Sequence, residues 1–163
     1  MLQTIETLRA FPPRLAAAVA GLSEEEIARP EAEGKWSVAD VVAHLFDLEL
    51  VYAVRIRTIL GGAGDTPLQA LAQDDWVTRV HRREPAAELL QDFGALRRMN
   101  LMLLSRLSDE ELDRTGLHPQ YGALSVRGAF ERIQRHDEKH LAQVERIKRG
   151  MRDEGLGGGP HRA

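Results

Sequence analysis

The chain has 163 residues, enough for one domain with a full hydrophobic core. It contains no cysteine, which excludes disulfides, thiolate metal ligands and a cysteine nucleophile, so thiol chemistry would need a thiol from outside the chain. The formal net charge of −3 gives no broad basic surface for nucleic acid, and no apolar run approaches the length that spans a membrane. We therefore expect a cytoplasmic protein that binds neither nucleic acid nor a membrane.

The first predicted helix is followed by a capped turn. Residues 2–20 are helical in composition, and Pro12-Pro13 is expected to break or restart this helix near its middle. Ser23 and Glu26 then match a capping box, in which each side chain accepts a hydrogen bond from the backbone N–H of the other residue. A loop separates this turn from the next helix.

The second predicted helix begins after Ser37, which can cap its N-terminus, and runs from Val38 to about Leu60. Trp36, just ahead of the cap, is expected to pack onto Val41. Apolar residues recur at helical spacing along this segment and predict a buried face. They are Val41, Leu45, Leu48, Tyr52, Ile56 and Ile59.

A glycine-rich run at 61–64 ends this helix, and a less regular connection follows to about Arg83, with a short helix expected around Asp74-Asp75-Trp76. A third long helix is predicted from Pro85 to Leu107. Asn100 lies in the middle of its apolar stripe, either as a hydrogen-bonded core residue or facing a cavity, and the first is commoner. The stripe consists of Leu89, Phe93, Leu96, Leu103 and Leu107.

Residues 107–114 nearly repeat residues 22–29, including the capping box, and the chain then enters a long helix at Ser125-Val126 as it did at Ser37-Val38. Chance reuse of a common cap is the alternative to a true repeat. The repeat predicts an all-α four-helix bundle built from two similar helix pairs, in one domain of residues 1–150 with a flexible glycine-rich tail at 151–163. The last helix runs to about Arg149. Its inward residues are Phe130, Ile133, Val144 and Ile147.

Two histidines on this last helix form a candidate metal site. His136 and His140 are four residues apart, so their rings lie one above the other on one helix face. Neutral imidazole nitrogens are ligands for zinc, nickel, copper or iron. A pair of this kind is more often solvated or hydrogen-bonded than metallated, and a reactive site needs a third ligand.

Four other histidines are available as that ligand. His161 in the glycine-rich tail and His81 among arginines are most simply solvated, and His118 precedes a proline in a loop. His44 lies on the second helix, seven residues after Ser37, at the margin of the apolar stripe. That position fits the rim of a site and fits exposure equally well. If the second and last helices are neighbours, the three rings can meet.

The motifs Trp36-Ser37-x6-His44-Leu45-x3-Glu49 and His136-x3-His140-Leu141 resemble the DinB/YfiT-like superfamily over nearly the whole chain, to about Arg149. The resemblance implies a four-helix bundle, commonly a homodimer, with a divalent metal held by His44, His136 and His140. Family members with known activity are thiol-dependent transferases or isomerases that use bacillithiol, mycothiol or a related small thiol, and many members have no assigned reaction.

The resemblance therefore favours an enzyme that transfers an external low-molecular-weight thiol to a small electrophile, with the metal stabilising the thiolate. Imidazole ligands alone do not distinguish zinc, nickel, iron and manganese. One alternative is a metal-dependent hydrolase of a small ester or amide. Others are a non-catalytic stress protein that binds a metal or ligand, and a dimeric bundle whose histidines hold no metal.

Charged residues near the histidines allow several roles. Asp47, Glu49 and Asp137 are the nearest carboxylates in sequence, and each could act as a general base or lie on the surface. Asp137 could orient a ligand ring, but a salt bridge to an arginine is favoured. Arg55 and Arg132 are two of several arginines that could bind an anionic thiol.

Overall fold

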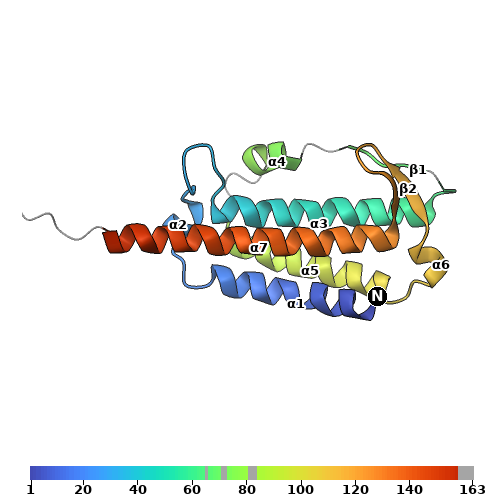
Figure 1. The fold of residues 1–163 in the computed structure, drawn as a ribbon, viewed down its shortest axis with the longest axis horizontal. Coiled ribbons are helices and arrows are strands. Elements are labelled where there is room, and N and C mark those ends of the chain that lie inside the picture. Colours follow the sequence, from blue (N-terminus) through green and yellow to red (C-terminus); the bar gives the residue numbers. More distant parts are fainter. Residues whose placement is uncertain (65, 71–72, 81–83, 158–163) are drawn as a thin grey trace, which may run out of the picture.

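The computed structural model describes residues 1–64, 66–70, 73–80 and 84–157, and its architecture is a four-helix bundle, as predicted (Figure 1). The long helices are α1 (Leu2–Val19), α3 (Val38–Gly61), α5 (Ala86–Leu104) and α7 (Val126–Gly157). Along the chain, the short helix α2 (Glu24–Ala28) lies between α1 and α3, and α6 (Asp109–Leu112) lies between α5 and α7. The short helix α4 (Gln73–Arg79) packs on α3. Helix α4 contains the predicted short helix around Asp74-Asp75-Trp76.

The two halves of the bundle interleave. Helices α3 and α5 run in one direction and α1 and α7 in the other (Figure 1). Helix α3 packs mainly against α5 and α7, and α1 packs mainly against the same two helices. The long helices of each predicted pair, α1 with α3 and α5 with α7, therefore occupy diagonal corners. This arrangement makes α3 and α7 neighbours.

Serine caps begin four of the helices that the structure describes, because each hydroxyl accepts a hydrogen bond from a backbone N–H that has no partner within the helix. At the start of α7, Ser125 accepts from the backbone N–H of Gly128 at 3.0 Å. Both predicted capping boxes are confirmed, and a third fixes the start of α3. The pairs are Ser23 with Glu26, Ser37 with Asp40, and Ser108 with Glu111.

Helix α1 is continuous through Pro12 and Pro13, so the predicted break is wrong. A proline inside a helix usually costs about 3 kcal/mol, partly because it leaves the carbonyl four residues earlier without a donor. For Pro12 that carbonyl belongs to Leu8. Arg97 of α5 donates to it from Nη1 at 3.2 Å, which replaces the missing helical hydrogen bond.

The buried face of α5 differs from the predicted stripe. Leu96, Leu103 and Leu107 are only partly buried, whereas Arg97 and Asn100 are almost completely buried. The buried position of Asn100 is as predicted, but that of Arg97 is not, because the carboxylates that accept from Arg97 lie on other helices. The buried residues of α5 are Ala86, Leu89, Phe93, Arg97, Asn100, Leu101 and Leu104.

A small sheet covers one end of the bundle, where the sequence predicted only loops (Figure 1). Strand β2 (Thr115–His118) pairs antiparallel with β3 (Gly122–Ser125) and parallel with β1 (Thr66–Pro67). Strands this short give no recognisable alternation of polar and apolar residues. Gly116 lies so close to α3 that a Cβ there would be 3.0 Å from the Ile59 side chain.

Helix α7 extends to Gly157, past its predicted end near Arg149, so the first part of the predicted tail is helical. The rest of the tail, residues 158–163, lies outside the described residues. Within the described ranges, no helix combines the length and the apolar composition needed to cross a membrane.

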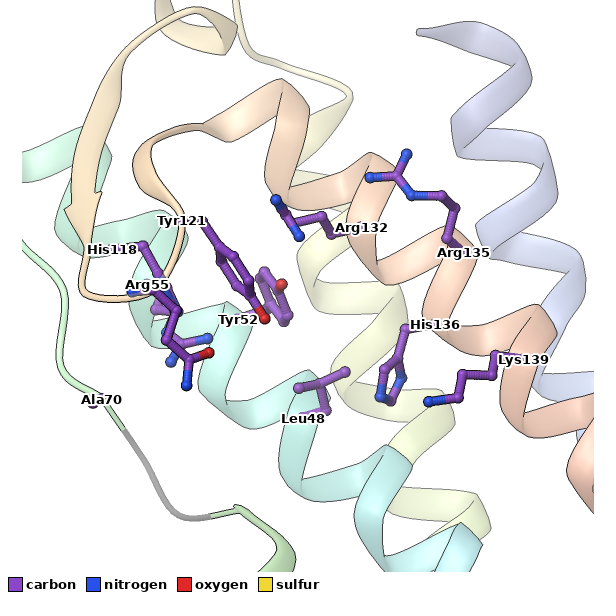
Figure 2. A pocket seen from close by; sticks show the side chains of 11 residues that line it. Leu48, Tyr52, Arg55, Ala70, His118, Tyr121, Arg132, Arg135, His136 and Lys139 are labelled. Atoms are coloured by element: carbon purple, nitrogen blue, oxygen red, sulfur yellow. Dashed lines mark hydrogen bonds between the residues drawn. The ribbon is translucent and has the colours of Figure 1, made fainter.

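A pocket of about 390 Å³ lies between α3, α7 and the turn that joins β2 to β3 (Figure 2). Leu48, Tyr52 and Arg55 line it from α3. Because α3 and α7 are neighbours, side chains from distant parts of the chain face this common space.

Candidate metal centre

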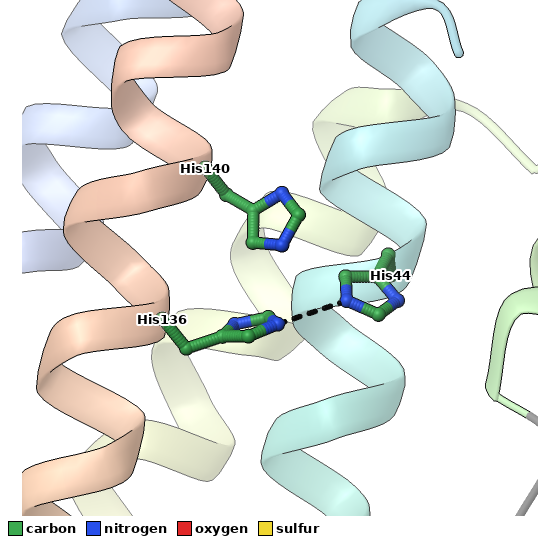
Figure 3. Close-up of side chains that lie close together, drawn as sticks. All are labelled: His44, His136 and His140. Carbon is green, nitrogen blue, oxygen red and sulfur yellow. Dashed lines mark hydrogen bonds between the residues drawn. The ribbon is translucent and has the colours of Figure 1, made fainter. Parts of the chain in front are cut away.

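The structure brings His44 of α3 together with His136 and His140 of α7, and the three rings face one another (Figure 3). The Nε2 atoms of His44 and His136 are 3.0 Å apart. The ring centroids are 4.2 Å apart for His136 and His140, and 4.8 Å apart for His44 and His140. His44 and His140 are each 5% exposed, and His136 is half-buried.

The spacing of the donor atoms fits one shared divalent ion. One nitrogen from each ring lies within 4.8 Å of the others. Around a tetrahedral zinc with Zn–N bonds of about 2.0–2.1 Å, two ligand nitrogens are roughly 3.4 Å apart. The Nδ1 atoms of His44 and His136 are buried and have no hydrogen-bonding partner among the described residues. The three imidazoles can therefore hold a metal ion.

Burial keeps the rings of His44 and His136 neutral, which is the state that binds a metal. Burial, with a smaller effect of the Lys139 charge, lowers the pKa of His44 from its ordinary value of 6.5 to about 4. Burial, followed by the neighbouring histidines, lowers the pKa of His136 to about 2. Protons therefore compete weakly for these nitrogens at neutral pH.

Two side chains outside the cluster, Gln143 and Trp36, contact the histidine rings. The Nδ1 atom of His140 is 2.8 Å from Oε1 of Gln143, an acceptor, so Nδ1 carries the proton and Nε2 is left with its lone pair. Trp36 lies against His44 with ring centroids 4.8 Å apart and stacks on His140 at 6.1 Å. Trp36 also packs against the core cluster that contains Val41. Trp36 covers one side of the cluster.

A buried polar network lies beside the histidines. Arg97, 2% exposed, donates to Asp137 with distances of 2.7 and 3.2 Å and to Glu49 at 3.0 Å. Asn100 donates to the other oxygen of Glu49 at 2.8 Å and accepts from Arg57. Two carboxylates share the Arg97 guanidinium, and burial raises the pKa of Asp137 to about 6.

This network divides the hydrophobic core into two clusters. On α5, Phe93 belongs to one cluster and Leu101 to the other, with Arg97 and Asn100 between them. On the other three long helices too, the buried residues on one side of the network belong to one cluster and those on the other side to the second. His136 and its neighbour Asp137 lie at the level of the network on α7, so the network fixes the backbone that carries the histidines.

The predictions for the nearby polar residues had mixed outcomes. The favoured salt bridge of Asp137 to an arginine and the hydrogen-bonded core position of Asn100 are confirmed. Glu49 and Asp47 are buried, not on the surface. Arg97 was not predicted as part of this region, because a single arginine among exposed arginines gives no local sign of burial.

The other histidines lie elsewhere. His118, judged a poor ligand, is not part of the cluster, but it is buried and lines the pocket. Its Nδ1 accepts a hydrogen bond from the backbone N–H of Gln120 at 3.2 Å, and burial, followed by Arg55 and Arg132, lowers its pKa. His81 and His161 lie outside the described residues.

A family model described as the DinB superfamily matches residues 7–144. The chain is 27% identical over 143 residues to a protein of Oceanobacillus iheyensis, covering 88% of this chain and 80% of the relative. It is 23% identical over 147 residues to a protein of Bacillus cereus, covering 90% of this chain and 84% of the relative. Both relatives carry the name of a proposed metal-dependent hydrolase.

A solved structure with a similar fold is that of YfiT from Bacillus subtilis, with a TM-score of 0.85 at 22% sequence identity. The match covers 91% of this chain and 86% of YfiT. YfiT is described as having an unusual four-helix bundle topology. The similarity supports the four-helix-bundle fold described here.

Proposed function

The chain belongs to the DinB superfamily, and we propose that it is a divalent-metal-dependent hydrolase of small molecules, with the metal held by His44, His136 and His140. The observation that carries the proposal is the convergence of three imidazoles at the edge of a pocket large enough for a small molecule. The names of the relatives from O. iheyensis and B. cereus support the hydrolytic reaction.

Three protein ligands leave a coordination position open, as in catalytic rather than structural zinc sites. When bound, a divalent ion there would polarise a substrate carbonyl and make water a better nucleophile near neutral pH. In the overall reaction the acyl carbon gains the hydroxyl of water, and the alcohol or amine leaves with the proton. The hydrolysis therefore needs no redox partner.

The chain's own residues would orient the reactants. The Gln143 contact directs Nε2 of His140 toward the cluster, and Trp36 excludes water from one side of it. His136 and Lys139 belong both to the wall of the pocket and to the surroundings of the cluster, so a molecule in the pocket lies next to the metal ligands. Proximity of this kind is what a hydrolase requires of its substrate site.

The test is hydrolysis of small 4-nitrophenyl esters and anilides by the full chain loaded with zinc, nickel, iron or manganese. We expect release of 4-nitrophenol or 4-nitroaniline that requires the metal and falls by at least about 100-fold in His140→Ala. Circular dichroism of the variant checks its folding. Metal-loaded protein that hydrolyses none of these substrates would contradict the proposal.

A second candidate function is transfer of a small external thiol to an electrophile. One observation favours it: arginines and a lysine line the pocket next to the histidines and could bind an anionic thiol. Turnover of monochlorobimane with a panel of low-molecular-weight thiols separates the two candidates. Metal-dependent turnover of the thiols without ester hydrolysis would favour transfer.

The homodimer, the identity of the metal and the cytoplasmic location stay predictions. Size-exclusion chromatography with light scattering tests the first. Competition between metals, followed by elemental analysis, tests the second.

A further inference from the structure

The pocket and the space around the candidate metal centre adjoin, because His136 and Lys139 of α7 line both. On α3, Tyr52 and Arg55 follow His44 by eight and eleven residues, about two and three helical turns, so they lie on the same face. On α7, Arg132 precedes His136 by four residues. Because the two helices run in opposite directions, both sets lead from the histidines toward the β2–β3 turn (Figure 2).

The walls of this pocket are strongly basic. Arg55, Arg132, Arg135 and Lys139 line it, and among the described residues its lining includes no aspartate or glutamate. In the part of the chain that the structure describes, none of these four cations forms an ion pair. The chain as a whole has a net charge of −3, so the positive charge of this pocket is opposite in sign to the net charge of the molecule. Unpaired cations around one cavity favour an anionic ligand.

Arg55 is an independent indication that the pocket binds an anion. It is only 7% exposed, and its Nη2 donates to the carbonyl of Gln69 at 3.1 Å. Its Nε atom is buried and has no hydrogen-bonding partner among the described residues. A buried guanidinium with an unused donor is costly unless a ligand or water accepts from it.

The turn between β2 and β3 forms another wall of the pocket. The ring of Tyr121 stacks on His118 with centroids 4.3 Å apart, and the guanidinium carbon of Arg132 lies 3.9 Å from the Tyr121 centroid. These contacts place Arg132 at the pocket wall without using its N–H groups on a carboxylate. The guanidinium therefore keeps donors for a ligand.

We infer that this pocket is a subsite for an oxyanion, a carboxylate or a phosphate, carried by the substrate, with Arg55 and Arg132 as its principal donors. The claim that the anion is part of a substrate rests on the proposed hydrolytic function. The claim that the pocket binds an anion does not. Arg132 lies about 6 Å from His136 along the helix axis at ~1.5 Å per residue. The substrate is therefore a short molecule whose anionic group lies a few bonds from the bond that is hydrolysed.

The direct test is isothermal titration of the full chain, both zinc-loaded and metal-free, with sodium phosphate and with sodium benzoate. We expect binding of at least one of the two anions in both metal states, and the stronger of the two identifies the group. Arg132→Gln and Arg55→Gln should each weaken it about tenfold. Arg98→Gln is the matched control, because Arg98 is exposed on α5 and lines none of the pockets described.

Several results would overturn the inference. One is that neither anion binds at concentrations up to about 50 mM. The others are that Arg132→Gln binds the anion as tightly as wild type does, or that Arg98→Gln loses as much anion affinity as Arg132→Gln. Binding that occurs only with zinc and is insensitive to the arginines would assign the anion to the metal instead. Since Arg55 is buried, Arg55→Lys and a thermal melt check its fold, while Arg132→Gln carries the test by itself.

A kinetic comparison separates failure of this inference from failure of the proposed function. If the chain is a hydrolase, it should prefer the mono-4-nitrophenyl ester of succinate, which carries a carboxylate, over 4-nitrophenyl acetate. Arg132→Gln should reduce that preference in kcat/KM about tenfold, whereas the control Arg98→Gln should change neither the preference nor acetate hydrolysis. Hydrolysis without any preference would contradict the subsite alone, and anion binding without hydrolysis would contradict the proposed reaction alone.

Discussion

Arg97 on α5 donates a hydrogen bond to the carbonyl of Leu8 on α1, the acceptor that Pro12 leaves without a helical donor. The same guanidinium binds Glu49 of α3 and Asp137 of α7, so one side chain connects all four long helices. Asp137 is the direct neighbour of His136 in the sequence. The polar centre of the bundle and the candidate metal site are therefore parts of one arrangement.

Replacing Arg97 should destabilise the fold strongly. Arg97→Met would remove the positive charge that two buried carboxylates share and the donor to the Leu8 carbonyl, and we expect a loss of about 3–5 kcal/mol in the free energy of unfolding. Urea denaturation measures it. Arg14→Met is the control, because Arg14 pairs with Glu138 on the surface, where an ion pair contributes less than about 1 kcal/mol. Similar losses in the two variants would contradict the buried network.

The stability of the metal-free protein should depend on pH through His44. Its pKa is about 4 in the folded chain and 6.5 ordinarily, so below pH 6.5 the unfolded chain takes up a proton that the folded chain does not. The stability due to His44 is complete above pH 6.5 and is lost as the pH falls toward 4, by up to about 3 kcal/mol.

Urea denaturation between pH 7 and 4.5 of wild type and His44→Gln checks this dependence. The raised pKa of Asp137 acts in the opposite direction, but it is present in both proteins, so it cancels in the comparison. The variant should lose about 2–3 kcal/mol less than wild type over this range. Parallel curves for the two proteins would show that His44 is not held neutral by burial.

Trp36 should report metal binding by fluorescence. Its ring contacts His44 and His140, so nickel or copper bound there would quench its emission. Trp76, the other tryptophan, is not among the residues around the cluster. We expect the quenching to persist in Trp76→Phe and to disappear in Trp36→Phe. Quenching that disappears only in Trp76→Phe would place the metal elsewhere.

Gln143 should tune metal affinity by holding His140. Its Oε1 accepts from Nδ1–H of the ring, and loss of such a contact typically lowers metal affinity about 10- to 100-fold. Competition of Gln143→Leu with a chromogenic chelator measures the change. Gln91→Leu, at an exposed position on α5, is the control and should match wild type. An unchanged affinity in Gln143→Leu would show that the ring needs no such support.

Local patterns predicted much of the fold. Ser23 and Ser108 were identified as caps because capping depends on residues three positions apart. The buried stripe of α3 was predicted for the same reason, since helical spacing exposes one face to the core. The inward positions of Phe130 and Ile133 on α7 are also confirmed.

Features that depend on distant partners were not predictable in this way. Nothing near Arg97 in the sequence shows that Glu49 and Asp137 will meet it, because the three lie on different helices. The meeting of His44 with His136 required α3 and α7 to adjoin, which spacing alone left open. The basic pocket was visible only as scattered arginines, of which Arg55 and Arg132 were two candidates among several.

Elemental analysis of untagged protein, supplemented with divalent metals and measured at neutral pH, tests the central claim most directly. We predict about one equivalent of metal per wild-type chain, and less than about a tenth in His44→Ala and in His140→Ala, with His81→Ala unchanged. Less than about a tenth of an equivalent in the wild type, or full retention in both histidine variants, would contradict the three-histidine metal centre.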